Sequence, residues 1–159
     1  MNIEELLSKM TLKEKVGQLC HGFYGFNATE RDENGNLQLT QAFKDYVLKF
    51  DSIGVLFSYF RSDPYSKRSY ANGGITLKER ESAYNMLQKF VIENTRLGIP
   101  VLLEENTPHG RQVLDALMYP SNINVGASFN PGLYKDQIYH ICHEARLGGV
   151  YCPNFSLFD

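Results

Sequence analysis

The segment Leu97–Gly110, LGIPVLLEENTPHG, constrains the fold of this chain more than any other part of the sequence. It reads as a helix end at Leu97–Gly98, a short apolar strand over Ile99–Leu103 and a polar cluster directly after it. In parallel α/β sheets, ligands bind at the carboxyl ends of the strands. Carboxylates crowded there are costly unless a ligand or partner satisfies them. The segment therefore predicts a parallel α/β sheet whose functional site begins at Glu104.

Helical patterns and short apolar runs alternate along the rest of the chain. The patterns predict helices over residues 1–20, 37–50, 76–97 and 130–146. A capping box, TLKE, predicts a break and a new helix start at Thr11, a second TLKE opens the helix at Thr76, and Asn130-Pro131 opens the last one. The apolar runs predict strands over residues 53–57, 99–103, 123–128 and 150–156. Alternation of this kind is typical of parallel βα units.

Length and composition indicate one ordinary globular domain over residues 1–159. The chain is 43% hydrophobic and 21% charged, with a net charge of −2, which gives no reason to expect a nucleic acid or an anionic membrane as partner. No apolar run approaches the roughly 20 residues of a membrane helix. Residues 1–20 carry charges and lack the apolar core of a signal peptide, so a cytoplasmic location is expected.

No cofactor or metal is expected. The three cysteines, Cys20, Cys142 and Cys152, are odd in number and lack metal-type spacing, so they read as free thiols. His140 and His143 could share a metal on one helix face, but no third ligand accompanies them. The glycines follow no phosphate-binding pattern.

Four stretches, taken together and in order, carry a family resemblance. They are LLSKMTLKEKVGQL at residues 6–19, IGVLFSYFRSDP at 53–64, the strand and acidic turn that lead to His109-Gly110, and YPSNINVGASFNPGLYKD at 119–136. In this order they resemble the amino-terminal barrel domain of glycoside hydrolase family 3, which contains β-glucosidases and β-xylosidases. The resemblance runs from about Leu6 to Asp159.

The resemblance implies a partial TIM barrel. A closed (β/α)8 barrel needs eight strands and typically ~250 residues, whereas this chain offers about four strands, or half a barrel. In the family the nucleophilic Asp and the acid/base Glu lie further along, so no catalytic residue is expected in this chain, and it should be inactive alone. Half a barrel would expose strand edges and an apolar face, so self-association or pairing with the missing downstream half is expected.

Glu104 and Glu105 are a tempting but poor catalytic pair. Retaining glycosidases hold two carboxyl groups ~5–5.5 Å apart across the scissile bond, whereas neighbouring residues of a strand point to opposite faces. We expect one glutamate to face the barrel mouth and bind a sugar hydroxyl or a basic residue, with the other packed behind it. The family places a sugar-binding Asp three residues before the His of His-Gly, which is Asn106 here. A one-residue insertion would bring Glu105 there instead.

Two further pairs of residues lie near the expected site. Arg61 and Asp63 follow a strand, and they form either a local turn salt bridge or, as the resemblance suggests, part of the sugar pocket. His109-Gly110 is implied to be structural, supporting the loop beside the site.

The resemblance thus predicts the amino-terminal part of a retaining β-glycosidase. The whole enzyme would hydrolyse terminal β-linked glucose or xylose units, and its ligand would be a β-glucoside or β-xyloside oligosaccharide. The competing hypothesis is a complete, non-catalytic sugar-binding or partner-binding module derived from such a barrel. The Phe155–Asp159 end, which reads as a strand without a helix after it, is less typical of a finished domain. An unrelated open doubly wound sheet fits the alternation but leaves the ordered motifs unexplained.

Overall fold

The strands and helices of the chain form a mixed α/β structure, which a computed structural model describes over residues 2–155. Its helices are α1 Ile3–Lys9, α2 Leu12–Leu19, α3 Gln41–Phe50, α4 Arg80–Asn94, α5 Asn122–Gly126 and α6 Pro131–Leu147, with short 3-10 turns η1 Gly25–Asn27 and η2 Leu77–Glu79. Its strands are β1 Thr29–Arg31, β2 Leu37–Leu39, β3 Val55–Phe57, β4 Leu102–Asn106 and β5 Val150–Asn154.

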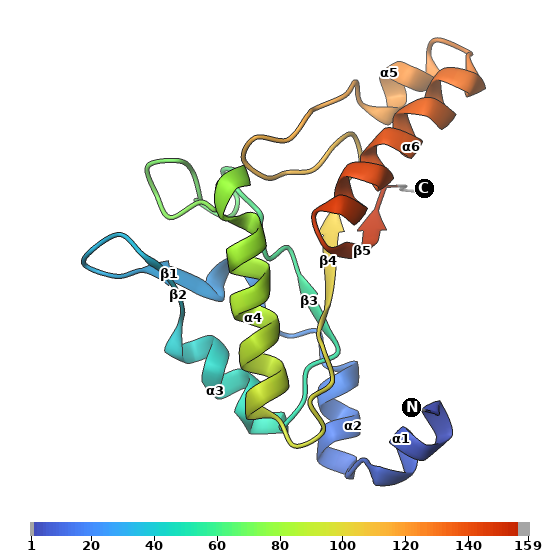
Figure 1. Cartoon of the computed structure of the whole chain (residues 1–159). Helices are drawn as coiled ribbons and strands as arrows, with labels where there is room; N and C mark the ends of the chain where they lie inside the picture. The colour runs from blue at the N-terminus through green and yellow to red at the C-terminus, as the bar shows by residue number, and fades with distance from the viewer. Residues whose placement is uncertain (1, 156–159) are drawn as a thin grey trace.

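The central element is a three-stranded parallel sheet in the order β3–β4–β5 (Figure 1). Leu103 of β4 lies opposite Leu56 of β3 and Val150 of β5. On the other edge of β3, Tyr24 forms a parallel bridge with Phe57, so the segment before η1 begins to extend the sheet. The predicted α/β class and parallel sheet are confirmed.

The two faces of the sheet differ sharply in burial. Leu56, Leu103 and Val150 are at most 1% exposed and belong to one apolar cluster. The helices α3 and α4 contribute Phe43, Val47, Ala83, Leu87 and Val91 to the same cluster. Because successive side chains of a strand alternate between faces, Leu102 points the other way and is 46% exposed. The sheet thus has a covered helix side and an open face.

The predicted helix starts are confirmed by their caps. Thr11 and Glu14 form a capping box at α2, and Thr76 and Glu79 form the same box at η2, immediately before α4. Asn130 accepts a hydrogen bond from the amide of Leu133 and precedes Pro131 at the start of α6. These short polar side chains satisfy backbone N–H groups that the first helical turn leaves free.

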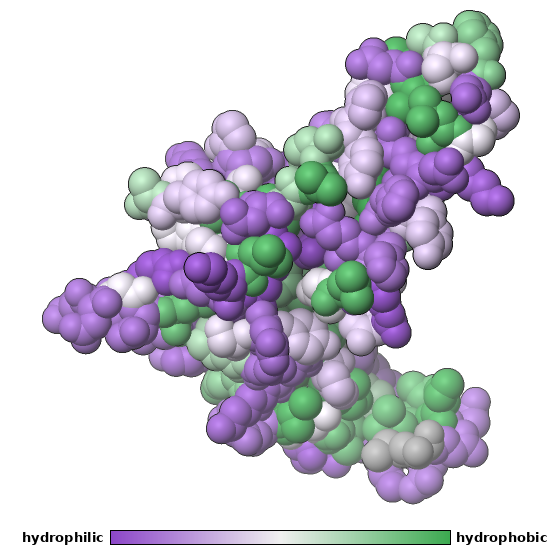
Figure 2. Space-filling view, turned by 45° about the horizontal axis from the view of Figure 1, so that its top comes forward, coloured by the Kyte–Doolittle hydropathy of each residue, from purple (hydrophilic) through white to green (hydrophobic). Residues whose placement is uncertain are grey.

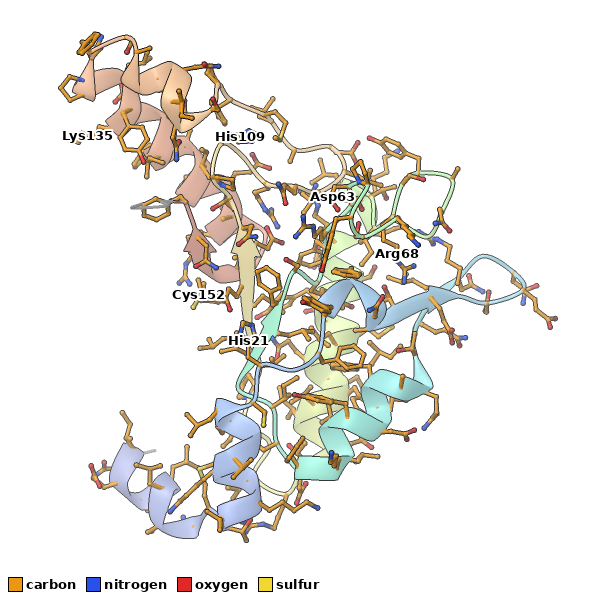
Figure 3. The ribbon with its side chains drawn as sticks, turned by 180° about the vertical axis from the view of Figure 1, so that it is seen from behind. His21, Asp63, Arg68, His109, Lys135 and Cys152 are labelled. Atoms are coloured by element: carbon orange, nitrogen blue, oxygen red, sulfur yellow. The ribbon has the colours of Figure 1, made fainter. Side chains whose placement is uncertain are left out.

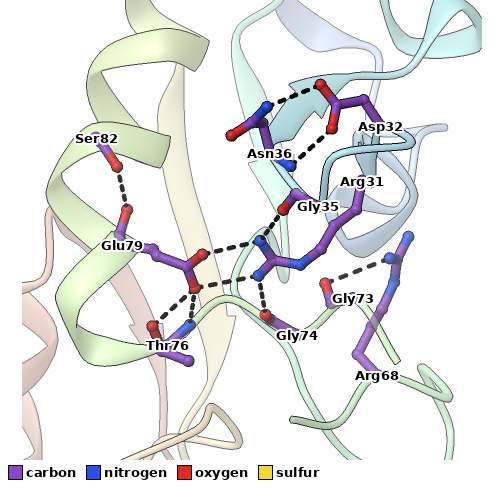
Figure 4. Close-up of polar contacts among 10 residues, drawn as sticks. All are labelled: Arg31, Asp32, Gly35, Asn36, Arg68, Gly73, Gly74, Thr76, Glu79 and Ser82. Carbon is purple, nitrogen blue, oxygen red and sulfur yellow. Dashed lines mark hydrogen bonds and ion pairs between the residues drawn. The ribbon is translucent and has the colours of Figure 1, made fainter. Parts of the chain in front are cut away.

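A β1–β2 hairpin that the sequence did not predict is tied to the start of α4. Both guanidinium Nη atoms of Arg31 reach the Glu79 carboxylate, at 2.9 and 3.1 Å, and the carbonyls of Gly35 and Gly74 accept further hydrogen bonds (Figure 4). Glu79 also accepts from Thr76, so one carboxylate serves the helix cap and the hairpin together.

Three predicted elements were wrong in type or position. Residues 123–128 alternate like a strand, but 122–126 form the short helix α5, in which Val125 is the buried residue. The helix expected over 37–50 begins only at Gln41, because 37–39 pair with β1. The strand expected at 99–103 lies at 102–106, after Pro100, which has no N–H for a ladder. The last strand ends at Asn154, and its predicted end at Ser156 lies outside the described residues.

Exposed apolar side chains gather at two ends of the molecule (Figure 2). One set lies on α1 and α2 and includes Ile3, Leu12 and Leu19. The other lies around α5 and α6 and includes Ile123, Phe129 and Leu133. Within residues 2–155 no helix is both long and apolar enough to cross a membrane.

The first prediction concerns acid unfolding. Hydrogen bonds from Arg96 lower the pKa of Glu14 to about 2, and those from Arg31 do the same for Glu79, from an ordinary value of 4.5. A depressed carboxyl pKa stabilises the fold fully above about pH 4.5, and this contribution disappears as the pH falls through about 2. The thermal unfolding midpoint should therefore fall steadily over that window.

Glu14→Gln should lower the unfolding free energy by about 1–3 kcal/mol at pH 7, since it removes charged hydrogen bonds. In this variant the thermal unfolding midpoint should fall less steeply as the pH is lowered from about 4.5 to about 2. Glu5, which pairs with Lys9 on the exposed surface of α1, provides the control, and Glu5→Gln should change stability by less than about 1 kcal/mol. If the midpoint falls with pH as steeply in Glu14→Gln as in the parent chain, the lowered pKa of Glu14 does not contribute to acid unfolding.

Candidate functional site

The strand β4 carries the predicted acidic cluster within the strand rather than after it. Glu104, Glu105 and Asn106 are its last three residues, so the two glutamates project to opposite faces of the sheet. Glu105 is 3% exposed on the helix side, whereas Glu104 lies half-buried on the open face. The two carboxylates therefore do not flank a common space and cannot act on one glycosidic bond together.

Glu105 is paired with a buried arginine that the sequence analysis missed. The Arg111 Nε and Nη2 atoms lie 2.8 and 2.9 Å from the two carboxylate oxygens of Glu105, and Arg111 is only 1% exposed. Its guanidinium also lies over the Phe60 ring, at 6.0 Å from the centroid. Such a two-point pair neutralises both charges and occupies both carboxylate oxygens. The one sequence feature that could have indicated a role for Arg111 is its position directly after His109-Gly110.

Glu104 is held by two neutral or weakly basic neighbours from distant parts of the chain. The amide Nδ2 of Asn154 in β5 donates to one carboxylate oxygen at 2.6 Å. The Nε2 atom of His21, which follows α2, lies 3.0 Å from the other oxygen. The His21 ring stands edge-on to Phe57 of β3, with 5.7 Å between centroids. The open face thus gathers groups from three parallel segments around one carboxylate.

Asn106 lies next along the same face and is opposite Asn154 in the strand register. Within residues 2–155 its side-chain amide makes no hydrogen bond, so both its donor and its acceptor are available. Asn106 also lines a narrow space beside Arg61, which places these two predicted residues together.

Arg61 and Asp63 form the local ion pair that the sequence allowed. The Nε and Nη2 atoms of Arg61 donate to one oxygen of Asp63 at 2.9 and 2.6 Å, and the other oxygen accepts from the Ser66 amide at 2.9 Å. Burial opposes ionisation, but the hydrogen bonds from Arg61 and Ser66 outweigh it and lower the pKa of Asp63. Arg61 is thereby fixed in orientation next to a narrow space that Glu105 and Asn106 also line.

His109 and Gly110 lie on the loop that follows β4, and Figure 3 shows His109 and Asp63 on loops beyond the sheet while His21 lies beside β4. The His109 carbonyl accepts a hydrogen bond from the Tyr119 amide at 2.7 Å. Gly110 has φ of +124°, and a Cβ there would lie 2.4 Å from the Leu117 carbonyl oxygen. The loop therefore needs glycine at this position for close backbone packing.

The polar groups at and beside the carboxyl end of β4 can form hydrogen bonds with polyhydroxylated ligands. Glu104 offers carboxylate acceptors, Asn106 offers a donor and an acceptor, and Arg61 offers guanidinium donors. Aromatic rings of Phe57 and Tyr24 lie beside the His21 end, where they line a hollow of about 320 Å³. His21 and Asn154 were not predicted from the sequence, because neither stands in a recognisable motif and only the parallel strand pairing brings them to Glu104. Within residues 2–155 no three metal-binding side chains come together.

The chain is similar to parts of two larger proteins. It is 30% identical over 149 residues to a protein of Formosa agariphila that carries the provisional name beta-xylosidase, covering 94% of this chain. It is 26% identical over 133 residues to Beta-glucosidase C of Emericella nidulans, covering 84% of this chain. The chain spans only 18% and 17% of the lengths of these relatives. No protein-family model matches the chain. The similarity indicates a glycosidase-like region.

The second prediction concerns the buried ion pair. Arg111→Met and Glu105→Leu should each cost about 3–5 kcal/mol of unfolding free energy, because each leaves the opposite charge buried without a partner. The double variant should cost clearly less than the sum of the two, since no charge remains unpaired. Urea unfolding followed by circular dichroism measures all four proteins. Additive losses would show that the two side chains do not stabilise each other.

The third prediction concerns Gly110. Gly110→Ala should destabilise the chain by about 1–3 kcal/mol, because an alanine would be strained at this φ and would collide with the Leu117 carbonyl. Gly126 of α5 is the matched control, since a Cβ there meets nothing within 4 Å. Gly126→Ala should be neutral or slightly stabilising in the same urea titration. Equal effects of the two substitutions would argue against the close approach at Gly110.

Proposed function

We propose that this chain is part of a retaining β-glycosidase of glycoside hydrolase family 3 and contributes the binding side chains for a terminal glucose or xylose unit. The observation that carries the proposal is the open sheet face, where His21 and Asn154 orient Glu104 beside the unbonded amide of Asn106. The ordered family motifs and the similarity to two proteins named as glycosidases support the same conclusion.

We propose further that the sheet is one part of a (β/α)8 barrel. The segment around Tyr24, then β3, β4 and β5, are parallel neighbours in the same order as in the chain. The long helices α4 and α6 connect successive strands, and the core lies on the side of the sheet that faces α3 and α4. Sequential parallel strands with helices outside are the arrangement of such barrels, in which the open face becomes the barrel interior.

The proposed sugar site consists of Glu104, Asn106, Arg61 and Asp63. Glu104 accepts hydrogen bonds from sugar hydroxyls, and the Asn106 amide binds a neighbouring hydroxyl. Both oxygens of Glu105 are bound to Arg111, which favours Asn106 over Glu105 at the family's sugar-binding Asp position. Asp63 acts through Arg61, whose guanidinium it orients.

The proposed role is binding, with the reaction completed by residues outside this chain. In the family an Asp attacks the anomeric carbon to form a glycosyl-enzyme, and a Glu donates a proton to the leaving oxygen and then activates water. None of the matched motifs in this chain supplies either group. His109 and Gly110 support the loop beside the sugar, as the family resemblance implies.

The fourth prediction tests this proposal by sugar binding. Isothermal titration of the chain with xylose and with glucose should detect weak binding of at least one sugar. Glu104→Gln should weaken that binding about tenfold or more, because a charged acceptor worth roughly 1.5–3 kcal/mol is lost. Glu30→Gln changes an exposed hairpin glutamate and is the control, with unchanged affinity. The chain should not hydrolyse an aryl β-xyloside or β-glucoside.

Two results would overturn the proposal. Unchanged sugar affinity in a folded Glu104→Gln variant would remove Glu104 from the site. Turnover of either aryl glycoside, lost in the Asn106→Ala plus Glu105→Ala double variant, would show that catalysis resides in this chain.

A further inference from the structure

A groove lies between α4 and α6, and its volume is about 820 Å³. Small-molecule sites in proteins occupy roughly 300–1,000 Å³. The loop after β4 closes one end of the groove, because it reaches the start of α4, where the Leu77 amide donates to Asp115 at 2.8 Å (Figure 1). Arg111 lines the groove, and its partner Glu105 lies on the helix side of the sheet. The groove is therefore separate from the open face that carries Glu104.

Arg80, the first residue of α4, brings a buried and unpaired charge to this groove. The residue is only 7% exposed, and its Nη2 atom donates to the Leu114 carbonyl on the loop after β4. Its Nε atom is buried without a hydrogen-bond partner, and no ion pair within residues 2–155 includes Arg80. A charge at this depth is costly without a partner, so the guanidinium has unused capacity for an anion.

The charged groups around Arg80 influence it without pairing with it. Burial is the largest effect and lowers the pKa of Arg80, and repulsion from Arg111 lowers it further. The Glu105 carboxylate attracts Arg80 but is already bound to Arg111. Glu144 and Asp115 attract it from farther along the groove wall. These two carboxylates would repel a doubly charged ligand, so the groove favours an anion with a single charge.

Most of the remaining groove surface is apolar. Tyrosine rings and leucine side chains line it from α4, the loop after β4, α6 and β5, namely Tyr84, Leu117, Tyr119, Leu147 and Tyr151. The Tyr84 ring packs against the turn at Gly149, where a Cβ would lie 2.8 Å from its Cε2 atom. Arg146 is held over the Tyr151 ring, with 4.2 Å from its Cζ atom to the centroid. A ligand that fits must therefore combine an apolar body with one negative group.

We propose that this groove binds a small aromatic monocarboxylate, whose carboxylate pairs with Arg80 and whose ring packs against the tyrosine and leucine side chains. A carboxylate suits a guanidinium because it accepts two parallel hydrogen bonds from it. An aromatic ring suits the tyrosines because such rings attract each other beyond their apolar contact. The inference is independent of the proposed function, since the proposed sugars are neutral and bind on the other face of the sheet.

The fifth prediction follows benzoate binding by two-dimensional NMR of the chain at pH 7. Benzoate should shift the amide signals of the groove residues and the Nε–H signal of Arg80. Benzamide has the same ring without the charge and should bind about tenfold more weakly or less, because the charged hydrogen bonds to Arg80 are lost. Inorganic phosphate, which lacks a ring and carries more charge at this pH, should also bind more weakly than benzoate.

Three variants locate the site. Arg80→Met keeps an apolar stem without the charge and should weaken benzoate binding about tenfold or more. Leu147 is 76% exposed, so Leu147→Glu should fold, and its added charge should weaken benzoate binding about threefold by repulsion. Lys89→Met removes a cation from an exposed position of the same helix as Arg80 and is the matched control, with unchanged affinity.

Stability without ligand distinguishes a binding role for Arg80 from a structural one. Because the Arg80 charge has no partner, the urea midpoint of Arg80→Met should equal or exceed that of the parent chain, whereas Arg111→Met should lower it. A midpoint that falls as far in Arg80→Met as in Arg111→Met would overturn the proposal. Absence of benzoate binding, benzamide binding as tight as that of benzoate, or unchanged benzoate affinity in folded Arg80→Met would do the same.

Discussion

The buried guanidinium of Arg111 is the group on which the arrangement around β4 depends. It binds both oxygens of Glu105, contacts the Phe60 ring and approaches the last turn of α6, where a Cβ at Gly148 would lie 2.2 Å from Nη1. A charge at this depth is tolerated only with a complete partner. The pair therefore fixes the loop after β4 against the strand and against the end of α6, and it commits Glu105 to the helix side of the sheet.

The position of Glu105 on the helix side also determines which carboxylate lies on the open face. Since neighbouring strand residues alternate, Glu105 on the helix side places Glu104 and Asn106 on the open face. The open face then collects His21 from the segment after α2, which bridges β3 in parallel at Tyr24, and Asn154 from β5, which pairs with β4 in parallel. The site is thus a consequence of strand pairing more than of any single motif.

Local chemistry made part of this structure predictable. The capping boxes at Thr11 and Thr76 and the Asn130-Pro131 pair each act within one helical turn, so the sequence alone locates those helix starts. The β1–β2 hairpin was missed because its strands have three residues each and are stabilised by Arg31 reaching Glu79, 48 residues away. Apolar and polar residues alternate over 123–128 as in a strand, but no strand within residues 2–155 pairs with them. A long-range partner such as His21 leaves no local signature at Glu104.

The contrast between the two glutamates shows why only one of them is suited to bind a ligand. Glu105 has its charge neutralised by Arg111 and is only 3% exposed. Glu104 is oriented by the uncharged amide of Asn154 and by the imidazole of His21, and its side chain keeps 19% exposure. A carboxylate that is fixed in direction without being paired to a permanent cation retains acceptor strength toward hydroxyl donors, because each oxygen can accept more than one hydrogen bond.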